Sequence, residues 1–574
     1  MVFYDFEVFS DDWLVVTLDP DKGEKVIVNN QLELKAFYEE HKKDIWIGFN
    51  NRHYDQYILK GILLGLSPKY VNDQIIIGGK NGWEISREFI IYPMINFDCM
   101  DRYDRGLKYF EGSLGHSIEE SSIPFNINRK LTEDELKEVI TYCEHDVEQT
   151  VQVFMEKKND FMAQLELVKM YQLPLDMMNK TKVQLSAKIL GAVKMEHHDE
   201  FEIDFPDTLE LKKYRHILEW YKNPVNCNYS KSIDVNVAGV MHSFGWGGLH
   251  GARPNYIGEG WFINMDVGSL YPTLMCRYNL MSRNVDEEGF DRFKEILRYR
   301  LELKHQGKKK EQAPLKIVLN GTYGAMKDKY NPLYDPLQAN RVCIYGQLLV
   351  LMLIEKLEPH CQIIQSNTDG VLVKLKRYED YDLIDDIAYE WEKRTGLILE
   401  FDEYRKVIQK DVNNYIIIDA EGKSKSKGAY VKELGKLDYD LKVVNKAVTD
   451  FFVNDIPVED TINGCQNLKD FQFVKKASSL YEVIFHGSER LSIKCVRCFA
   501  SKDEADGGLF QMKKSTKVIE QMSETPEHSR LVNGEINDMG VPDWLDRNWY
   551  VNLAKKRINA FKGDEDDIEL YNEV

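Results

Sequence analysis

Asp266-Val267-Gly268-Ser269-Leu270-Tyr271-Pro272 is the stretch that decides how this sequence is interpreted, together with Lys316-Ile317-Val318-Leu319-Asn320-Gly321-Thr322-Tyr323-Gly324 and Asn367-Thr368-Asp369-Gly370. The first and third stretches each predict an aspartate at the end of a β-strand. The second predicts a helix that is opened by Ala313-Pro314 after a basic loop at 305–312 and that has Lys316, Asn320, Tyr323 and Gly324 on one face. Two carboxylates that can share a pair of metal ions, opposite a cationic helix, predict a site for phosphoryl transfer.

The third stretch has a structural alternative. Residues 362–373 predict two apolar strands around an Asp-Gly turn, and Asp-Gly is a common way to close a β-hairpin. The transfer site is preferred because the three stretches occur together and in this order.

Length and composition predict a globular protein of several domains. The chain has 574 residues, of which 43% are hydrophobic and 11% aromatic. It has no run of about 18 uncharged apolar residues and no basic leader, so neither a membrane span nor a signal peptide is expected. Nine scattered cysteines favour a reducing cytoplasm. Cys495 and Cys498 form a lone pair and are interpreted as strand residues rather than zinc ligands.

The formal net charge of −19 is unusual for a protein that binds phosphates. Local basic surfaces matter more than the total charge. Basic residues cluster at 304–310, 423–427, 475–476 and 513–514. An isolated cluster is more often a solvated face, but the first two flank the stretches quoted above and are interpreted as phosphate contacts.

A second group of acids lies near the N-terminus. Residues 3–9 predict a buried strand that points Asp5 and Glu7 to one face. Two acids on a core strand are costly unless a cation offsets the desolvation, although an edge strand with solvated acids is the alternative. An apolar strand from residue 45 ends in a loop with Asn51, Tyr54 and Asp55, for which an ordinary helix N-cap is an equal alternative.

The third element of this group is a helix. Thr132 to Glu135 predict a capping box, and apolar residues then recur at helical spacing. Tyr142 and Asp146 are four residues apart and share one face. With Asp5, Glu7 and Asp55, Asp146 would complete a four-carboxylate site for two metal ions.

The three opening stretches resemble motifs A, B and C of family B (polymerase alpha-like) DNA polymerases, in the compact form of bacteriophages. The N-terminal third resembles the proofreading exonuclease of that family. Six motifs occur in family order, from Asp5 to about Lys427. The resemblance implies an α/β and α+β multidomain fold, in which an RNase H-like exonuclease precedes a right-hand polymerase.

The resemblance also implies domain boundaries. These are a 3′→5′ exonuclease (1–160), a connecting region and first palm part with motif A (161–285), short helical fingers with motif B (286–326), a second palm part with motif C (327–434), and a thumb with an acidic tail (435–574). The thumb is expected to begin with a helix at 441–453, and the acidic stretch of its tail is at 564–567. A glycine-rich turn at 246–251 matches a family loop that contacts template.

In the polymerase half, the resemblance implies that Asp266 and Asp369, with the backbone of Val267, bind two Mg²⁺ ions, for which Mn²⁺ can substitute. Tyr271 would exclude a 2′-hydroxyl. Arg300 and Lys316 would grip the triphosphate, and Lys316 would protonate the leaving pyrophosphate. Further implied nucleotide contacts are Val267, Ser269, Leu270, Asn320 and Tyr323.

In the exonuclease half, the resemblance implies a second pair of metal ions, held by Asp5, Glu7, Asp55 and Asp146. Tyr142 would orient the attacking water that cleaves a 3′-terminal phosphodiester. Implied DNA contacts over the whole chain are Asn51, Tyr54, Gly247, Gly248, Gly324, Tyr415, Lys425 and Lys427.

Several positions depart from the family pattern. Asn367 and Gly370 stand where motif C usually has an acid and a serine. Val8, Gly245 and Asn413 replace a small hydroxyl residue, a tyrosine and a lysine, respectively. We expect altered metal affinity or fidelity at motif C, not loss of chemistry.

The expected partners are primer-template DNA and deoxynucleoside triphosphates, bound by a monomer. The gaps between the three motifs are too short for the insertions of protein-primed phage relatives, so we expect priming from a nucleic-acid 3′ end. By resemblance, the setting is the cytoplasm of a phage-infected bacterial cell.

Two other hypotheses remain. The first is an exonuclease whose polymerase half has become a DNA-binding module, as the loss of an acid at Asn367 suggests. The second is a non-catalytic binding protein of the same fold. Retention of Asp266, Lys316 and Asp369 disfavours the first, and retention of the four N-terminal acids disfavours the second.

Overall fold

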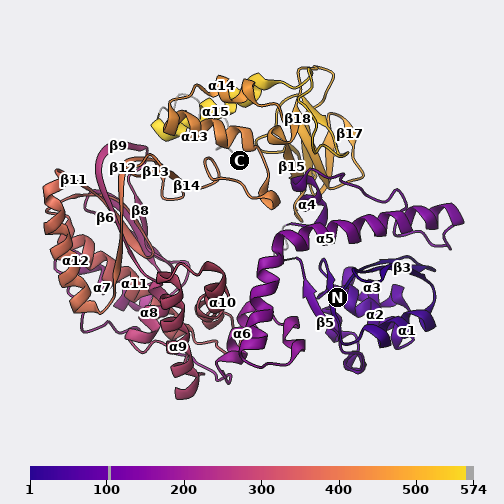
Figure 1. Cartoon of the computed structure of the whole chain (residues 1–574), viewed down its shortest axis with the longest axis horizontal. Coiled ribbons are helices and arrows are strands. Elements are labelled where there is room, and N and C mark those ends of the chain that lie inside the picture. Colours follow the sequence, from indigo (N-terminus) through magenta and orange to yellow (C-terminus); the bar gives the residue numbers. More distant parts are fainter. Residues whose placement is uncertain (101–104, 564–574) are drawn as a thin grey trace. The chain divides into compact units, whose positions relative to one another are not determined.

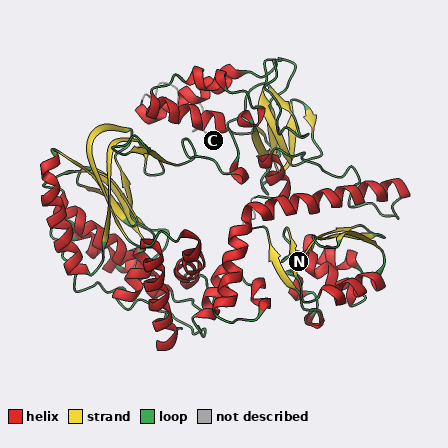
Figure 2. Ribbon diagram, in the orientation of Figure 1, coloured by secondary structure: helices red, strands yellow, loops and turns green. Residues whose placement is uncertain are grey.

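The computed structural model describes residues 1–100 and 105–563 and has a mixed α/β, multidomain architecture (Figures 1 and 2). The acidic stretch expected at 564–567 lies outside the described residues. Two compact units divide the chain. Unit 1 contains Met1–Lys180, Leu434–Val443 and Gly464–Tyr550, and unit 2 contains Thr181–Glu433, Val444–Asn463 and Val551–Val574. This division does not test the functional boundaries at 160, 285, 326 and 434, which stay predictions.

Unit 1 begins with a five-stranded sheet of order β3-β2-β1-β4-β5. Its strands are β1 (Val2–Val8), β2 (Trp13–Asp19), β3 (Gly23–Val28), β4 (Ile45–Gly48) and β5 (Ile95–Asp98). β1 pairs antiparallel with β2 and parallel with β4, so it is a central strand. Because β1 is buried on both faces around Tyr4 and Trp46, any acid on it is taken out of water.

Five helices accompany this sheet: α1 (Gln31–His41), α2 (Asp55–Leu63), α3 (Pro68–Ile76), α4 (Leu107–Leu114) and α5 (Glu133–Met170). The short 3₁₀ helices are η1 (Gly82–Glu84), η2 (Arg87–Ile91) and η3 (Leu175–Asn179). The predicted capping box is confirmed: the Thr132 side chain accepts the Glu135 N–H, and the Glu135 side chain accepts the Thr132 N–H. This cap fixes where α5 starts and therefore where Tyr142 and Asp146 lie.

The C-terminal part of unit 1 holds two small sheets. One consists of β15 (Phe473–Lys476), β18 (Cys495–Ala500) and β21 (Ser529–Leu531). The other consists of β17 (Glu489–Arg490), β16 (Tyr481–His486), β19 (Leu509–Lys513) and β20 (Ile519–Gln521). Two 3₁₀ helices, η6 (Lys436–Asp438) and η7 (Leu468–Phe471), precede them. Cys495 and Cys498 both lie on buried strand β18, as predicted for strand residues.

Unit 2 is built on a nine-stranded sheet of order β14-β13-β12-β9-β11-β10-β8-β7-β6 (Figure 1). The strands are β6 (Ser232–Val237), β7 (Val240–Gly245), β8 (His250–Ala252), β9 (Tyr256–Val267), β10 (Gln362–Asn367), β11 (Gly370–Leu375), β12 (Leu399–Asp411), β13 (Asn414–Ile418) and β14 (Ser424–Lys427). β9 is paired with β11 on one side and β12 on the other, so it lies inside the sheet.

The helices of unit 2 are α6 (Lys182–Ile189), α7 (His216–Lys222), α8 (Leu270–Arg277), α9 (Glu287–His305), α10 (Lys309–Met326), α11 (Pro336–Leu357) and α12 (Tyr381–Thr395). Two 3₁₀ helices are η4 (Pro224–Asn226) and η5 (Tyr378–Asp380), and α14 (Val458–Gly464) and α15 (Arg547–Lys562) follow later in the chain. The helix expected at 441–453 is confirmed as α13 (Lys442–Asn454).

The prediction of a loop at 305–312 is largely wrong. Helix α10 begins at Lys309, and only a short turn separates it from the end of α9 at His305. Gln312 N–H already donates to the Lys308 carbonyl at 3.2 Å. Lys, Glu and Gln are good helix formers, so the helix starts upstream of Pro314, which lies inside it and not at its first turn.

Helix α11 is the central helix of unit 2. Within residues 1–100 and 105–563 it is the one helix long and apolar enough to cross a membrane, and 94% of its apolar window is buried inside the fold. Asp335 directly precedes its first residue, Pro336, and the Asp335 side chain accepts the Gln338 N–H as an N-cap.

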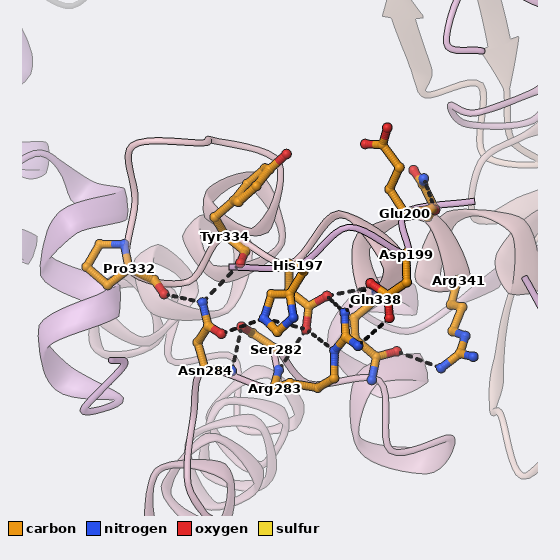
Figure 3. Close-up of polar contacts among 12 residues, drawn as sticks. His197, Asp199, Glu200, Ser282, Arg283, Asn284, Pro332, Tyr334, Gln338 and Arg341 are labelled. Atoms are coloured by element: carbon orange, nitrogen blue, oxygen red, sulfur yellow. Dashed lines mark hydrogen bonds and ion pairs between the residues drawn. The ribbon is translucent and has the colours of Figure 1, made fainter. Parts of the chain in front are cut away.

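A polar network fixes both ends of the α9–α10 hairpin (Figure 3). Arg283 precedes α9, and its guanidinium binds the fully buried Asp335 carboxylate at 2.7 Å and Asp199 at 2.6 Å. Asn284 donates to the carbonyls of Pro332 and Tyr334 at 2.7 and 3.0 Å. The segments that enter and leave the hairpin are therefore tied together at its base.

Candidate active sites

Strand pairing brings the two motif aspartates together in unit 2. Asp266 is next to last in β9, and Asp369 lies in the turn between β10 and β11. β11 runs antiparallel to β9 with Gly370 opposite Asp266. The Val267 N–H donates to the Asp369 carbonyl at 2.7 Å. The predicted hairpin is confirmed, and its turn lies directly beside the end of β9.

The environment of Asp266 disfavours its charge. Burial, and then the charge of Asp369, raise the pKa of Asp266 to about 6. Asn264 opposes this shift, because its amide donates to the Asp266 carboxylate at 2.6 Å. A divalent cation between the two aspartates would relieve the repulsion that raises this pKa.

Gly370 is required by this pairing. A Cβ atom on Gly370 would lie 2.0 Å from Oδ1 of Asp266 and 2.4 Å from the Met265 carbonyl oxygen. Neither distance is possible between non-bonded atoms. The register therefore explains the departure from serine at this position, which the sequence alone left unexplained.

Two further acids, Glu400 and Asp402, were missed by the sequence analysis. They lie on β12, opposite Asp266 and Asn264 respectively, so all four side chains share one face of the sheet. The charges of Asp402 and Glu400 also contribute to the raised pKa of Asp266. Glu400 binds Lys304 of α9 at 2.6 Å. Their alternation along one strand, like that of Asp5 and Glu7, was the signal that could have revealed them.

A cavity of about 230 Å³ opens on this face. Its lining includes Asp266, Asp402 and Asn367 together with three of the predicted DNA contacts, Tyr415, Lys425 and Lys427. The structure therefore gathers acids and predicted DNA contacts around one hollow, although they come from separate parts of the sequence.

The glycine-rich turn lies against the motif C hairpin. A Cβ atom on Gly248 would approach Oγ1 of Thr368 to 2.4 Å, and the Gly247 carbonyl accepts a bond from Gln347 of α11. The turn is thus fixed next to the Asp369 loop, where the template contact was predicted.

Helices α8 to α10 supply the remaining predicted residues. The rings of Tyr271 on α8 and Tyr323 on α10 are 4.3 Å apart between centroids and inclined at 45°. Arg300 on α9 donates to the Ser269 hydroxyl, and Ser269 has a left-handed backbone with φ of 55°. Lys316, Asn320 and Gly324 form an exposed stripe on α10, as predicted, while Val267 and Leu270 are buried.

The four N-terminal acids are also brought together, within unit 1. Asp5 and Glu7 come from β1, Asp55 from the first residue of α2 and Asp146 from α5. Asp55 accepts the Phe6 N–H at 3.2 Å, which joins α2 to β1. Burial, and then the charges of neighbouring acids such as Asp55 and Asp146, raise the pKa values of Asp5 and Glu7 well above the usual range. Burial likewise raises the pKa of Asp55 to about 7 and that of Asp146 to about 6.

Lys108 and Glu111 belong to this centre and were missed. Lys108 Nζ on α4 lies 2.5 Å from Asp146 and 3.1 Å from Glu111, and 4.6 Å from the centre of the Tyr142 ring. Glu111 is fully buried. The signal in the sequence was weak, because a lysine and a glutamate three residues apart occur on many solvated helices.

The two predicted DNA contacts of this half face inward. Asn51 is fully buried and donates to the Phe97 carbonyl at 3.3 Å. The Tyr54 hydroxyl donates to Asn72 at 2.8 Å. Both side chains hold the loop that precedes Asp55, and the structure does not bring the Asn51 side chain to the surface.

The donor atoms suit hard divalent cations in both centres. Carboxylate oxygens are the ligands that Mg²⁺ and Mn²⁺ prefer. Ligand atoms of Asp5, Glu7 and Cys143 all lie within 4.8 Å of one another, as do those of Glu111, His145 and Asp146. Burial raises the pKa values of Asp55 and Asp266, and a bound divalent cation would offset that cost, so the acids fit a metal ion.

No protein-family model matches the chain. No curated protein matches it. Among solved structures, it is similar to the family B DNA polymerase of the hyperthermophilic archaeon Pyrobaculum calidifontis, with a TM-score of 0.41 and 14% identity over 98% of this chain and 77% of that one. The functional assignment therefore depends on the residues of this chain.

The raised pKa of Asp55 predicts a pH-dependent cost to stability. Its pKa of about 7 in the folded protein exceeds the usual aspartate value of 3.8, so its contribution to stability falls as pH rises from about 4 to about 7. In chelator-treated protein, Asp55→Asn should raise the midpoint of thermal unfolding at pH 8 and much less at pH 4. Asp11→Asn, an exposed acid, is the control. An equal gain at both pH values would contradict this explanation.

Proposed function

We propose that this protein is a template-directed DNA polymerase that extends primer 3′ ends and that carries a separate 3′→5′ exonuclease. The observation that carries the proposal is the β9–β11 register, which sets Asp266 beside the Asp369 turn on a face lined by predicted DNA contacts. The four carboxylates of unit 1 support the exonuclease.

In the polymerase centre, Asp266 and Asp369 would hold two Mg²⁺ ions, which supply charge stabilisation for in-line nucleotidyl transfer when bound. Arg300 lies at Ser269 and would bind the triphosphate there. The exposed Lys316 on α10 would contact the same phosphates and donate a proton to the leaving pyrophosphate. Tyr271, fixed by its contact with Tyr323, would lie beneath the sugar.

In the exonuclease centre, Asp5, Glu7, Asp55 and Asp146 would hold a second pair of divalent ions, which activate water and stabilise the leaving oxygen when bound. Tyr142 would orient the water through its hydroxyl. Lys108, which lies between Asp146 and Glu111, would orient the Asp146 carboxylate. The separation of the two groups of acids into different compact units supports independent activities.

Finer features of the resemblance are also proposals. We propose that the protein is of the compact bacteriophage type, with the palm, fingers and thumb boundaries given above. Its physiological ion would be Mg²⁺, and it would extend a nucleic-acid 3′ end. It would act as a monomer in an infected bacterial cell. The second candidate, an exonuclease with a polymerase half that only binds DNA, is favoured by Asn367 alone.

Loss of Asp369 should slow extension strongly. Asp369→Ala removes one of the two aspartate ligands and should slow Mg²⁺-dependent primer extension by a factor of about 100 or more, or about 3 kcal/mol in the barrier. Asn367→Asp should keep or raise the rate. Asp385→Ala, an exposed acid on α12, serves as the control. Extension by Asp369→Ala at the wild-type rate would refute the two-metal assignment.

Removal of the Tyr271 ring should admit ribonucleotides. Tyr271→Ala opens the space that the 2′-hydroxyl would need, so the ratio of deoxy- to ribonucleotide incorporation should fall by about tenfold or more. Tyr271→Phe keeps the ring and its contact with Tyr323, and should keep discrimination. Single-nucleotide kcat/KM values measure both. Equal discrimination by Tyr271→Ala and the wild type would remove the proposed role.

The exonuclease should be separable. Asp5→Ala combined with Glu7→Ala removes two ligands from one strand and should abolish degradation of labelled single-stranded DNA. Extension of a matched primer should persist, because Asp266 and Asp369 are untouched, and terminal mismatches should then be extended untrimmed. Asp11→Ala is the matched control. Continued degradation by the double variant, or equal loss of both activities, would show that the sites are organised differently.

A further inference from the structure

Helix α4 connects the nuclease centre to the C-terminal part of unit 1. Its first turn carries Lys108, which lies against Asp146. Its last turn presents the carbonyls of residues 111–114, which have no donor within the helix itself. The Glu111 and Gly112 carbonyls accept from the N–H groups of His116 and Gly115 just beyond the helix, each at 3.0 Å. Three side chains far along the chain, Lys469, Gln472 and Arg497, reach the carbonyls of this last turn.

These contacts cover every carbonyl of the last turn. Arg497 Nη2 donates to the carbonyls of Glu111 and Gly112 at 3.5 and 3.1 Å. Gln472 Nε2 donates to the Ser113 carbonyl at 3.3 Å, and Lys469 Nζ donates to the Leu114 carbonyl at 2.5 Å. Arg497 also donates to the His116 carbonyl at 2.5 Å, just beyond the helix.

Arg497 is a costly residue to place here. It lies on β18 with no exposed surface, and burial lowers its pKa to about 10. A buried guanidinium is tolerated when it is hydrogen-bonded, and the carbonyl end of a helix attracts positive charge. Its remaining bonds, to the carbonyls of Val532 and Gly534 at 3.4 and 2.7 Å, anchor it within its own segment.

The backbone joins the same two segments. Ile118 N–H donates to the Asn533 carbonyl at 2.7 Å, and Ile536 N–H donates to the Gly115 carbonyl at 3.0 Å. A Cβ atom on Gly112 would lie only 2.8 Å from Val474 of β15. An eight-residue helix is marginal by itself, so the position of α4 depends on these contacts.

We propose that Arg497 is a positioning residue for the nuclease centre: it fixes α4 and thereby holds Lys108 over Asp146. Glu111 makes the link direct, because its carbonyl accepts from Arg497 while its carboxylate binds Lys108. The nuclease centre is therefore completed by residues 469–497, which lie beyond the polymerase motifs in sequence. The inference rests on the proposed exonuclease function.

The test uses the full chain with Arg497→Met, which keeps an unbranched apolar stem and removes the donors. Degradation of labelled single-stranded DNA should lose about tenfold or more in kcat with little change in KM, because misplacement affects the reacting groups and not DNA binding. Amide exchange in residues 107–118 should accelerate. Arg497→Lys should recover part of both, and extension of a matched primer should be unchanged in each.

Arg530→Met is the matched control. Arg530 lies on β21 of the same sheet, but its guanidinium binds Asp503 and Asp506 at 2.9 and 2.8 Å and does not contact α4. It should leave nuclease activity and α4 exchange at wild-type levels. Equal nuclease loss in Arg530→Met and Arg497→Met, or wild-type values for Arg497→Met in both measurements, would overturn the proposal.

A second variant covers the case in which Arg497→Met does not fold. Lys469→Met removes the half-buried donor to Leu114 and should produce a smaller loss of kcat with faster α4 exchange, which Lys469→Arg should reverse. Unchanged α4 exchange in Lys469→Met would count against the proposal. If the wild-type chain degrades no DNA, the proposed exonuclease fails, while the exchange measurements still decide whether Arg497 positions α4.

Discussion

Antiparallel pairing of β9 with β11 is the constraint on which the larger candidate centre depends. The pairing places Gly370 opposite Asp266 and joins Val267 to Asp369 through the backbone. A slip of one residue would turn every side chain of β11 to the other face. Glycine is the residue that fits beside Asp266, because any Cβ would occupy the position of its carboxylate oxygen. The register of β9 against β11 therefore also determines which groups lie beside Asp266 in the site.

Both centres concentrate negative charge in places from which water is partly excluded. Burial, and to a smaller extent the charges of neighbouring acids, raise the pKa values of Asp266 and Asp55, which destabilises the fold at neutral pH unless cations offset the cost. Each centre supplies partial relief, from the amide of Asn264 in one case and the ammonium of Lys108 in the other. Such residual charge favours divalent ions over a purely structural role for these acids.

Local signals in the sequence were sufficient for several elements. The capping box at Thr132 located the start of α5, and alternation of apolar residues around the Asp-Gly turn located the β10–β11 hairpin. Pro314 is a misleading signal, because proline favours the first turn of a helix but the preceding lysines and glutamine also form helix. The grouping of the six motifs into two acidic centres also followed from the sequence through family resemblance, since each motif is short and contiguous.

What only the tertiary structure decided is how separate segments meet. Glu400 joins the Asp266 face because β12 pairs with β9, and no short motif marks that pairing. Lys108 reaches Asp146 through a short helix whose carbonyl end is held by Arg497, hundreds of residues away. The sequence by itself determined the local elements and the acids they carry, because hydrogen bonding and side-chain periodicity act over a few residues. Packing decided which cationic side chains contact those acids, because contacts between remote segments depend on the whole fold.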